Sequence, residues 1–181
     1  MAVKYKHISP VGQYDENSYW AACIEWWTRA QNVGAFNQED LFDNYLLMRG
    51  DGGSVNMNGI IQVIEDPRFS MRYIPYYSGA QFTADRVRNL LATGPLYVGH
   101  YSHDISNNHV NVIFDITGTG SHAKVWAMEP HWKKIPGADE VGYIGHHVHR
   151  PLRRYTSGEV HVGMLKGMSS EGTGYDESYY Y

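Results

Sequence analysis

The chain has 181 residues and a mass of 20.6 kDa, the size of one compact domain. Hydrophobic residues make up 43% of it and charged residues 19%, which supports a buried core and excludes an intrinsically disordered chain. The formal net charge is −4 and there is no basic block, so we expect neither nucleic acid nor an anionic membrane as a partner.

Other functional classes are excluded by what the sequence lacks. The apolar runs are too short for a transmembrane helix, and residues 1–10 contain no apolar signal-peptide segment. We therefore expect no membrane insertion, and the sequence indicates synthesis in the cytoplasm without fixing a final location. The single cysteine, Cys23, excludes an internal disulfide framework and a Cys-rich zinc site.

The first half of the chain predicts helices. A helix over residues 16–31 is expected because Asp15, Asn17 or Ser18 can cap it, and its three tryptophans and few charges predict burial on most of its surface. Further helices are predicted over residues 38–48 with Asn37 and Asp40 as a capping pair, 55–65 ended by Asp66-Pro67, and 84–92 capped by Thr83. Between the last two helices, residues 69–77 alternate as in a strand.

The second half predicts strands separated by Gly, Asn, Ser or Pro. Their expected ranges are residues 96–100, 108–116, 123–128, 145–149 and 159–165. Helices followed by an antiparallel sheet indicate an α+β fold. We expect one domain over residues 1–171, with a helical part at about 11–93 and a β part at about 94–171, followed by a Tyr-rich acidic tail, 172–181.

Polar residues stand at a characteristic spacing along these elements. Gln13 lies six residues before Tyr19-Trp20-Ala21-Ala22, at the start of the predicted buried helix. His109 opens a strand after Gly94-Pro95, and Glu129 begins Glu129-Pro130-His131-Trp132 after the next strand. Over roughly residues 11–132 this order resembles the papain-like cysteine peptidases, especially the bacterial branch of bacteriocin-leader peptidases and secreted effector proteases.

The resemblance implies a papain-like fold in which the first helix lies between the two parts. It also implies roles: Gln13 as the oxyanion residue, His109 as the base and Glu129 as the group that orients it. Tyr19 stands where the family has its nucleophilic cysteine. A phenol, with a pKa of about 10, is far less nucleophilic at neutral pH than a paired thiolate, and its oxygen lies beyond the place of a thiol sulfur. We therefore expect the usual papain chemistry to be absent.

Cys23 offers an alternative nucleophile. It follows Tyr19 by one helical turn, and Asn17 lies six residues before it. With His109 it would make an active cysteine peptidase or amidase of the effector or toxin type. The competing interpretation is that Cys23 is a small buried hydrophobic residue.

The histidines suggest a weaker alternative, a metal-binding module. His146, His147 and His149 are close in sequence, and His147 and His149 are expected to share one face of a strand. Two imidazoles hold zinc or nickel only if a third ligand converges, and no standard ligand spacing is present. We otherwise expect no cofactor.

The tyrosines favour a role in protein contacts. The chain has 15, four of them in its last seven residues, and tyrosine buries area at low entropic cost while keeping a polar group. We expect a catalytically inactive papain-like protein that serves as a binding or structural component. By analogy with papain-like domains beside secretion machines and virion parts, it is expected to be a homo-oligomer or a subunit of a phage or bacterial secretion or injection assembly.

Overall fold

The computed structural model describes residues 3–45, 55–134 and 142–166. Its helices are α1 (Tyr19–Gln31), α2 (Gln38–Asn44), α3 (Met57–Glu65) and α4 (Ala84–Leu91). Its strands are β1 (Met71–Tyr76), β2 (Leu96–Ser102), β3 (Asn107–Thr117), β4 (Lys124–Lys134), β5 (Tyr143–Pro151) and β6 (Val160–Leu165). In the described ranges, no helix has both the length and the apolar character that a membrane crossing needs.

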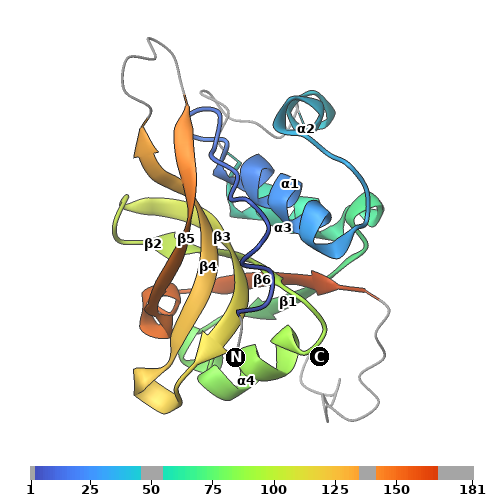
Figure 1. Cartoon of the computed structure of the whole chain (residues 1–181). Coiled ribbons are helices and arrows are strands. Elements are labelled where there is room, and N and C mark those ends of the chain that lie inside the picture. The colour runs from blue at the N-terminus through green and yellow to red at the C-terminus, as the bar shows by residue number, and fades with distance from the viewer. Residues whose placement is uncertain (1–2, 46–54, 135–141, 167–181) are drawn as a thin grey trace.

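The strands form one six-stranded sheet in the order β1-β6-β2-β3-β4-β5, and every neighbouring pair is antiparallel. Helices α1 and α3 pack on one face of the sheet and α4 on the other, while α2 lies outside α1 (Figure 1). Each face has its own hydrophobic core. This is the α+β architecture that the sequence predicted.

Helix α1 is buried almost all round because it lies between the sheet and α2. Residues 19–28 are all buried. The Trp20 ring meets Tyr45 edge to face at 5.4 Å between centroids, and Trp26 lies 5.4 Å from Phe114 of β3. Such aromatic contacts stabilise beyond the area they bury. The prediction from its tryptophans that this helix is buried is thus confirmed.

The predicted elements are all present, with several corrected boundaries. Helix α1 begins at Tyr19, three residues later than expected, and the Ser18 hydroxyl bonds to Asp15 instead of capping the helix. The expected caps Asn37 and Thr83 do accept the amides of Asp40 and Arg86. Helix α3 begins at Met57 because Asn56 caps it.

Two further differences concern the sheet. Strand β4 does not end before Glu129 but continues to Lys134, since a register shift between Glu129 and Lys133 lets it keep pairing with β5. Strand β1, which falls in the predicted helical part, pairs with β6 and belongs to the sheet. The predicted end of the second helix at residues 46–48 and the tail 172–181 lie outside the described residues.

Candidate active site

Tyr19, the first residue of α1, lies against His109. The centroids of the two rings are 5.2 Å apart, and Tyr19 is only 2% exposed. Its hydroxyl donates to the backbone oxygen of Val55 at 3.2 Å. Burial raises the pKa of Tyr19 to about 12, so the side chain is a neutral phenol in this position. The proximity to His109 agrees with the predicted site, and the neutral phenol makes Tyr19 unsuited to nucleophilic attack.

His109 and Glu129 form a buried pair between β3 and β4. Nε2 of His109 lies 2.6 Å from Oε1 of Glu129, and both side chains are almost completely buried. The backbone amide of His131 also donates to Oε1, at 3.0 Å. The structure therefore brings together the two residues that the sequence assigned to the base and its orienting group.

The second carboxylate oxygen of Glu129 has partners that the sequence analysis did not identify. Oε2 accepts from Arg150 at 2.9 Å and from the Asn111 amide at 3.1 Å. Burial alone would raise the pKa of Glu129. The charge and hydrogen bond of His109, the charge of Arg150 and the amide of His131 outweigh it and lower that pKa to about 2. Glu129 is thus ionised at neutral pH.

Gln13 is held at the end of the sheet beside the start of α1. Its backbone amide donates to Pro130 of β4 at 3.2 Å, and its carbonyl accepts from Tyr143 of β5 at 3.0 Å. Only glycine fits before it, because a Cβ at Gly12 would lie 1.6 Å from the carbonyl oxygen of Tyr143. The side-chain nitrogen donates to the backbone oxygen of Asp15 at 2.7 Å, while Oε1 is buried without a described partner.

Cys23 lies deeper in α1, against the backbone of β3. It is fully buried, and its thiol donates to the carbonyl oxygen of Val110 at 3.3 Å. Burial, and secondarily the charge of Glu129, raise the pKa of the Cys23 thiol well above its usual value. These surroundings keep the thiol protonated and inaccessible. They favour the interpretation of Cys23 as a buried hydrophobic residue.

His147 and His149 occupy aromatic surroundings. His147 contacts the rings of Trp26 and Phe114, with centroids 6.0 and 5.1 Å away. His149 stacks on Trp126 at 4.6 Å and shares a hydrogen bond with Thr117. Within the described ranges, no three His, Cys, Asp or Glu side chains converge to hold a metal ion.

Long-range contacts explain why the sequence analysis missed Asn111, Arg150 and their neighbours. Asn111 follows His109 by two positions on β3, so strand alternation alone places both on one face and is the signal that was available. Arg150 approaches from β5, 39 residues after Asn111, and only the order of strands in the sheet brings it there. His100 of β2 faces His109 in register. Burial, followed by the charges of His109 and Arg150, lowers the pKa of His100 to about 3.

One solved structure places this geometry in a known fold. A crystal structure of UfSP from C. elegans matches 87% of this chain with a TM-score of 0.51 and 13% sequence identity. The match covers 33% of the UfSP chain, so the present chain spans about a third of its length. No protein-family model and no curated protein sequence matches the chain. UfSP has the fold of the papain-like cysteine proteases, and at this identity the match shows that the present chain shares this α+β fold.

Proposed function

We propose that this protein is a papain-like domain without papain chemistry, and that its role is to bind other proteins or to form part of a structure. The observation that carries the proposal is the placement of Tyr19. A buried, neutral phenol at the first residue of α1 packs on His109, where the family has a thiol. An active thiol nucleophile needs an accessible, easily ionised cysteine, and Cys23 is neither accessible nor easily ionised.

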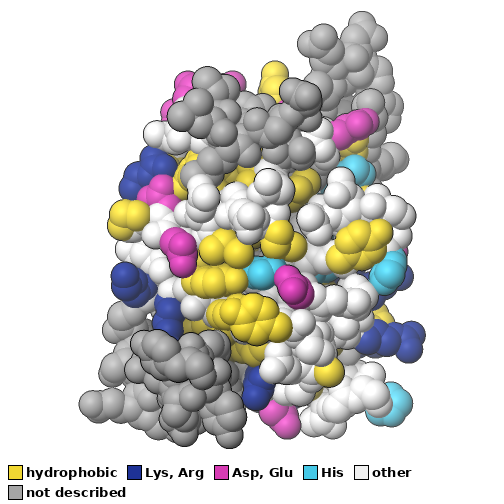
Figure 2. Space-filling model, turned by 180° about the vertical axis from the view of Figure 1, so that it is seen from behind, with side chains coloured by type: hydrophobic (Ala, Val, Ile, Leu, Met, Phe, Trp, Pro, Cys, Tyr) yellow, Lys and Arg dark blue, Asp and Glu magenta, His cyan; other side chains and the backbone are white. Residues whose placement is uncertain are grey.

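The surface supports a role in binding. The exposed large hydrophobic side chains among the described residues are Tyr14, Tyr77, Tyr101 and Ile144. Three of the four are tyrosines, a residue type enriched in protein interfaces. Figure 2 shows hydrophobic groups gathered in the middle of one face, around a histidine and beside acidic groups. Membership of a phage or bacterial secretion or injection assembly rests on analogy among papain-like domains.

Thiol labelling tests the absence of peptidase chemistry. The folded protein is treated with an epoxysuccinyl probe and the modified site is read by peptide mass spectrometry, with His109→Ala in parallel. We expect Cys23 to stay unlabelled until the protein is denatured. Rapid labelling of Cys23 in the native chain that disappears in His109→Ala would overturn the proposal, because it would show a displaced but working nucleophile.

A second variant tests whether Tyr19 occupies the nucleophile's place. Tyr19→Cys is made in a Cys23→Ala background, so that the introduced thiol is unique. We expect the probe to label this thiol, and His109→Ala to slow labelling by about tenfold or more, because general-base assistance contributes at least that much. A Ser18→Cys variant in the same background is the matched control. Equal labelling at positions 18 and 19 would contradict the assignment of position 19.

The oligomeric state tests the structural role. Light scattering after size-exclusion chromatography would compare the full chain with a chain truncated after Glu171. We expect the full chain to form an oligomer and truncation to weaken it. A full chain that stays monomeric at high concentration would contradict self-assembly and leave binding to a different protein as the proposed role.

A further inference from the structure

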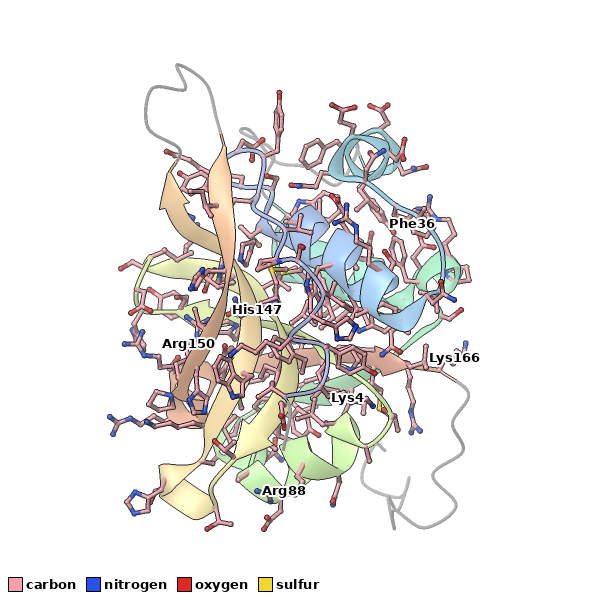
Figure 3. The ribbon with its side chains drawn as sticks, viewed as in Figure 1. Lys4, Phe36, Arg88, His147, Arg150 and Lys166 are labelled. Carbon is pink, nitrogen blue, oxygen red and sulfur yellow. The ribbon has the colours of Figure 1, made fainter. Side chains whose placement is uncertain are left out.

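Arg150 is a largely buried cation beside the His109–Glu129 pair. It lies on β5, the outer strand of the sheet (Figure 3). Its side chain is nevertheless only 16% exposed. One terminal nitrogen contacts Oε2 of Glu129 at 2.9 Å and Oδ1 of Asn111 at 2.5 Å. Its Nε donates to the hydroxyl of Tyr155 at 2.9 Å, and the guanidinium lies over that ring. Three different elements therefore fix the guanidinium.

The contacts divide the two oxygens of the Glu129 carboxylate between two pairs of partners. Oε1 receives His109 and the amide of His131, whereas Oε2 receives Arg150 and Asn111. The other amide contact of Asn111 goes to the carbonyl of Met128. The carboxylate thus has a hydrogen-bond donor on each oxygen, and neither oxygen is free to rotate towards another group.

This division determines the state of the imidazole. An ionised carboxylate only accepts hydrogen bonds, so Nε2 of His109 carries the hydrogen. Nδ1 is buried and has no described hydrogen-bond partner, and the rings of Tyr19, His100 and His131 surround the imidazole. His100 is neutral at pH 7 because burial, and then the charges of His109 and Arg150, lower its pKa. Arg150 is therefore the permanent cation in the group of side chains described around Glu129.

We propose that Arg150 is a positioning residue of the candidate site: by holding Oε2 of Glu129 it keeps Oε1 on the Nε2–H of His109 and so fixes the tautomer and the orientation of the imidazole. A carboxylate held through one oxygen alone can rotate, and the imidazole bound to it then loses its fixed orientation. The contacts of Arg150 and Asn111 with Oε2 prevent that rotation. The inference concerns the chain with its native Tyr19 and holds whether or not the candidate site has catalytic activity.

Nitrogen-15 NMR of labelled histidine tests the proposal. The signals of His109 are assigned by their loss in His109→Gln, and they report which ring nitrogen carries the hydrogen. In the native chain we expect the Nε2–H tautomer to dominate. In Arg150→Met, which removes the charge and keeps much of the length, we expect the share of the Nδ1–H tautomer to rise by about tenfold, the effect of losing one hydrogen bond to a charged group. Arg150→Lys restores most of the Nε2–H tautomer.

Arg153→Met is the matched control, because Arg153 is an exposed arginine on the same stretch of chain. We expect it to leave the His109 signals unchanged. A folded Arg150→Met protein whose His109 signals match those of Arg153→Met would overturn the proposal. If Arg150→Met does not fold, Tyr155→Phe removes only one anchor of the guanidinium and should raise the share of the Nδ1–H tautomer of His109 by a smaller amount. An unchanged share in that variant would also overturn the proposal.

Discussion

The helix side and the sheet side of the candidate active site are stabilised by different interactions. On the helix side, Tyr19 fills its place by packing and by one hydrogen bond to Val55. On the sheet side, His109, Glu129 and Arg150 form a chain of charge-assisted contacts, each of which depends on the next. Packing tolerates replacement by a side chain of similar shape, whereas a buried charge left without its partner is costly. We therefore expect a substitution at Tyr19 to affect only the contacts of that residue. A substitution at His109, Glu129 or Arg150 should instead disrupt the contacts of all three.

The largest effect is expected from breaking the sheet side at Glu129. Glu129→Ala leaves Arg150 as a buried charge without its carboxylate, and we expect the free energy of unfolding to fall by about 3–5 kcal/mol. Urea unfolding followed by circular dichroism measures the change. Glu159→Ala is the control. Glu159 also lies near a histidine, with Oε2 3.5 Å from Nε2 of His161, but its side chain is 60% exposed, so its loss should cost at most about 1 kcal/mol. Equal effects would contradict the dependence of the sheet side on Glu129.

A smaller effect is expected from Gly12, which joins the two sides. Gly12→Ala forces a Cβ against the carbonyl of Tyr143 and should displace Gln13 from between β4 and β5. We expect a loss of about 1–3 kcal/mol of unfolding free energy, as for other overpacked sites. Gly158→Ala is the matched control, since a Cβ at Gly158 meets nothing within 4 Å. A similar stability of both variants would show that Gln13 is not held by this close approach.

The stability of the sheet side is expected to depend on pH, through His100 and Glu129. The pKa of His100 is about 3 in the folded protein because of its burial, against 6.5 as the usual value, so the unfolded chain binds more protons between these pH values. Stability is therefore expected to fall as the pH drops below about 6.5, by about 2 kcal/mol between pH 7 and pH 5. Glu129 adds a separate loss of stability at lower pH. Its pKa is about 2 in the folded protein, against 4.5 as the usual value, so between these pH values the unfolded chain binds a proton that the folded chain does not.

Urea unfolding at intervals from pH 3 to pH 7 measures both windows. His100→Asn should reduce the slope between pH 6.5 and pH 5 and keep the loss at lower pH. Part of the slope should remain, because burial also lowers the pKa values of His131, His147 and His161. A wild-type curve that is flat between pH 7 and pH 5 would contradict the buried neutral state of His100.

The smallest effect is expected on the helix side. Tyr19→Phe removes the hydrogen bond to Val55 and keeps the ring against His109, so we expect a loss of about 1 kcal/mol. Thermal unfolding by calorimetry measures it. A loss as large as that of Glu129→Ala would show that the hydrogen bond of the phenol, and not the packing of its ring, accounts for most of the stability that Tyr19 provides.

The helices, the strands and part of the candidate site could be predicted from local sequence patterns and from the family resemblance. Helix caps such as Asn37 and Thr83 are local hydrogen bonds between neighbouring residues, and the burial of α1 follows from its tryptophans, so both were predictable. The order of the predicted helices and strands indicated an α+β fold. The resemblance to the papain-like peptidases implied the pairing of His109 with Glu129, and the structure shows that contact.

The groups that surround the His109–Glu129 pair depend on the order of the strands in the folded sheet. Arg150 reaches Glu129 across 21 residues because β5 lies beside β4 in the sheet, and no local pattern encodes that order. The burial of Cys23 has the same origin. Its thiol donates to a backbone carbonyl of β3, which is 87 residues away in sequence and covers the thiol in the fold. Capping and alternation depend on residues close in sequence, whereas burial and charge pairing depend on which distant strands become neighbours, and this is why the second set could not be predicted from the sequence.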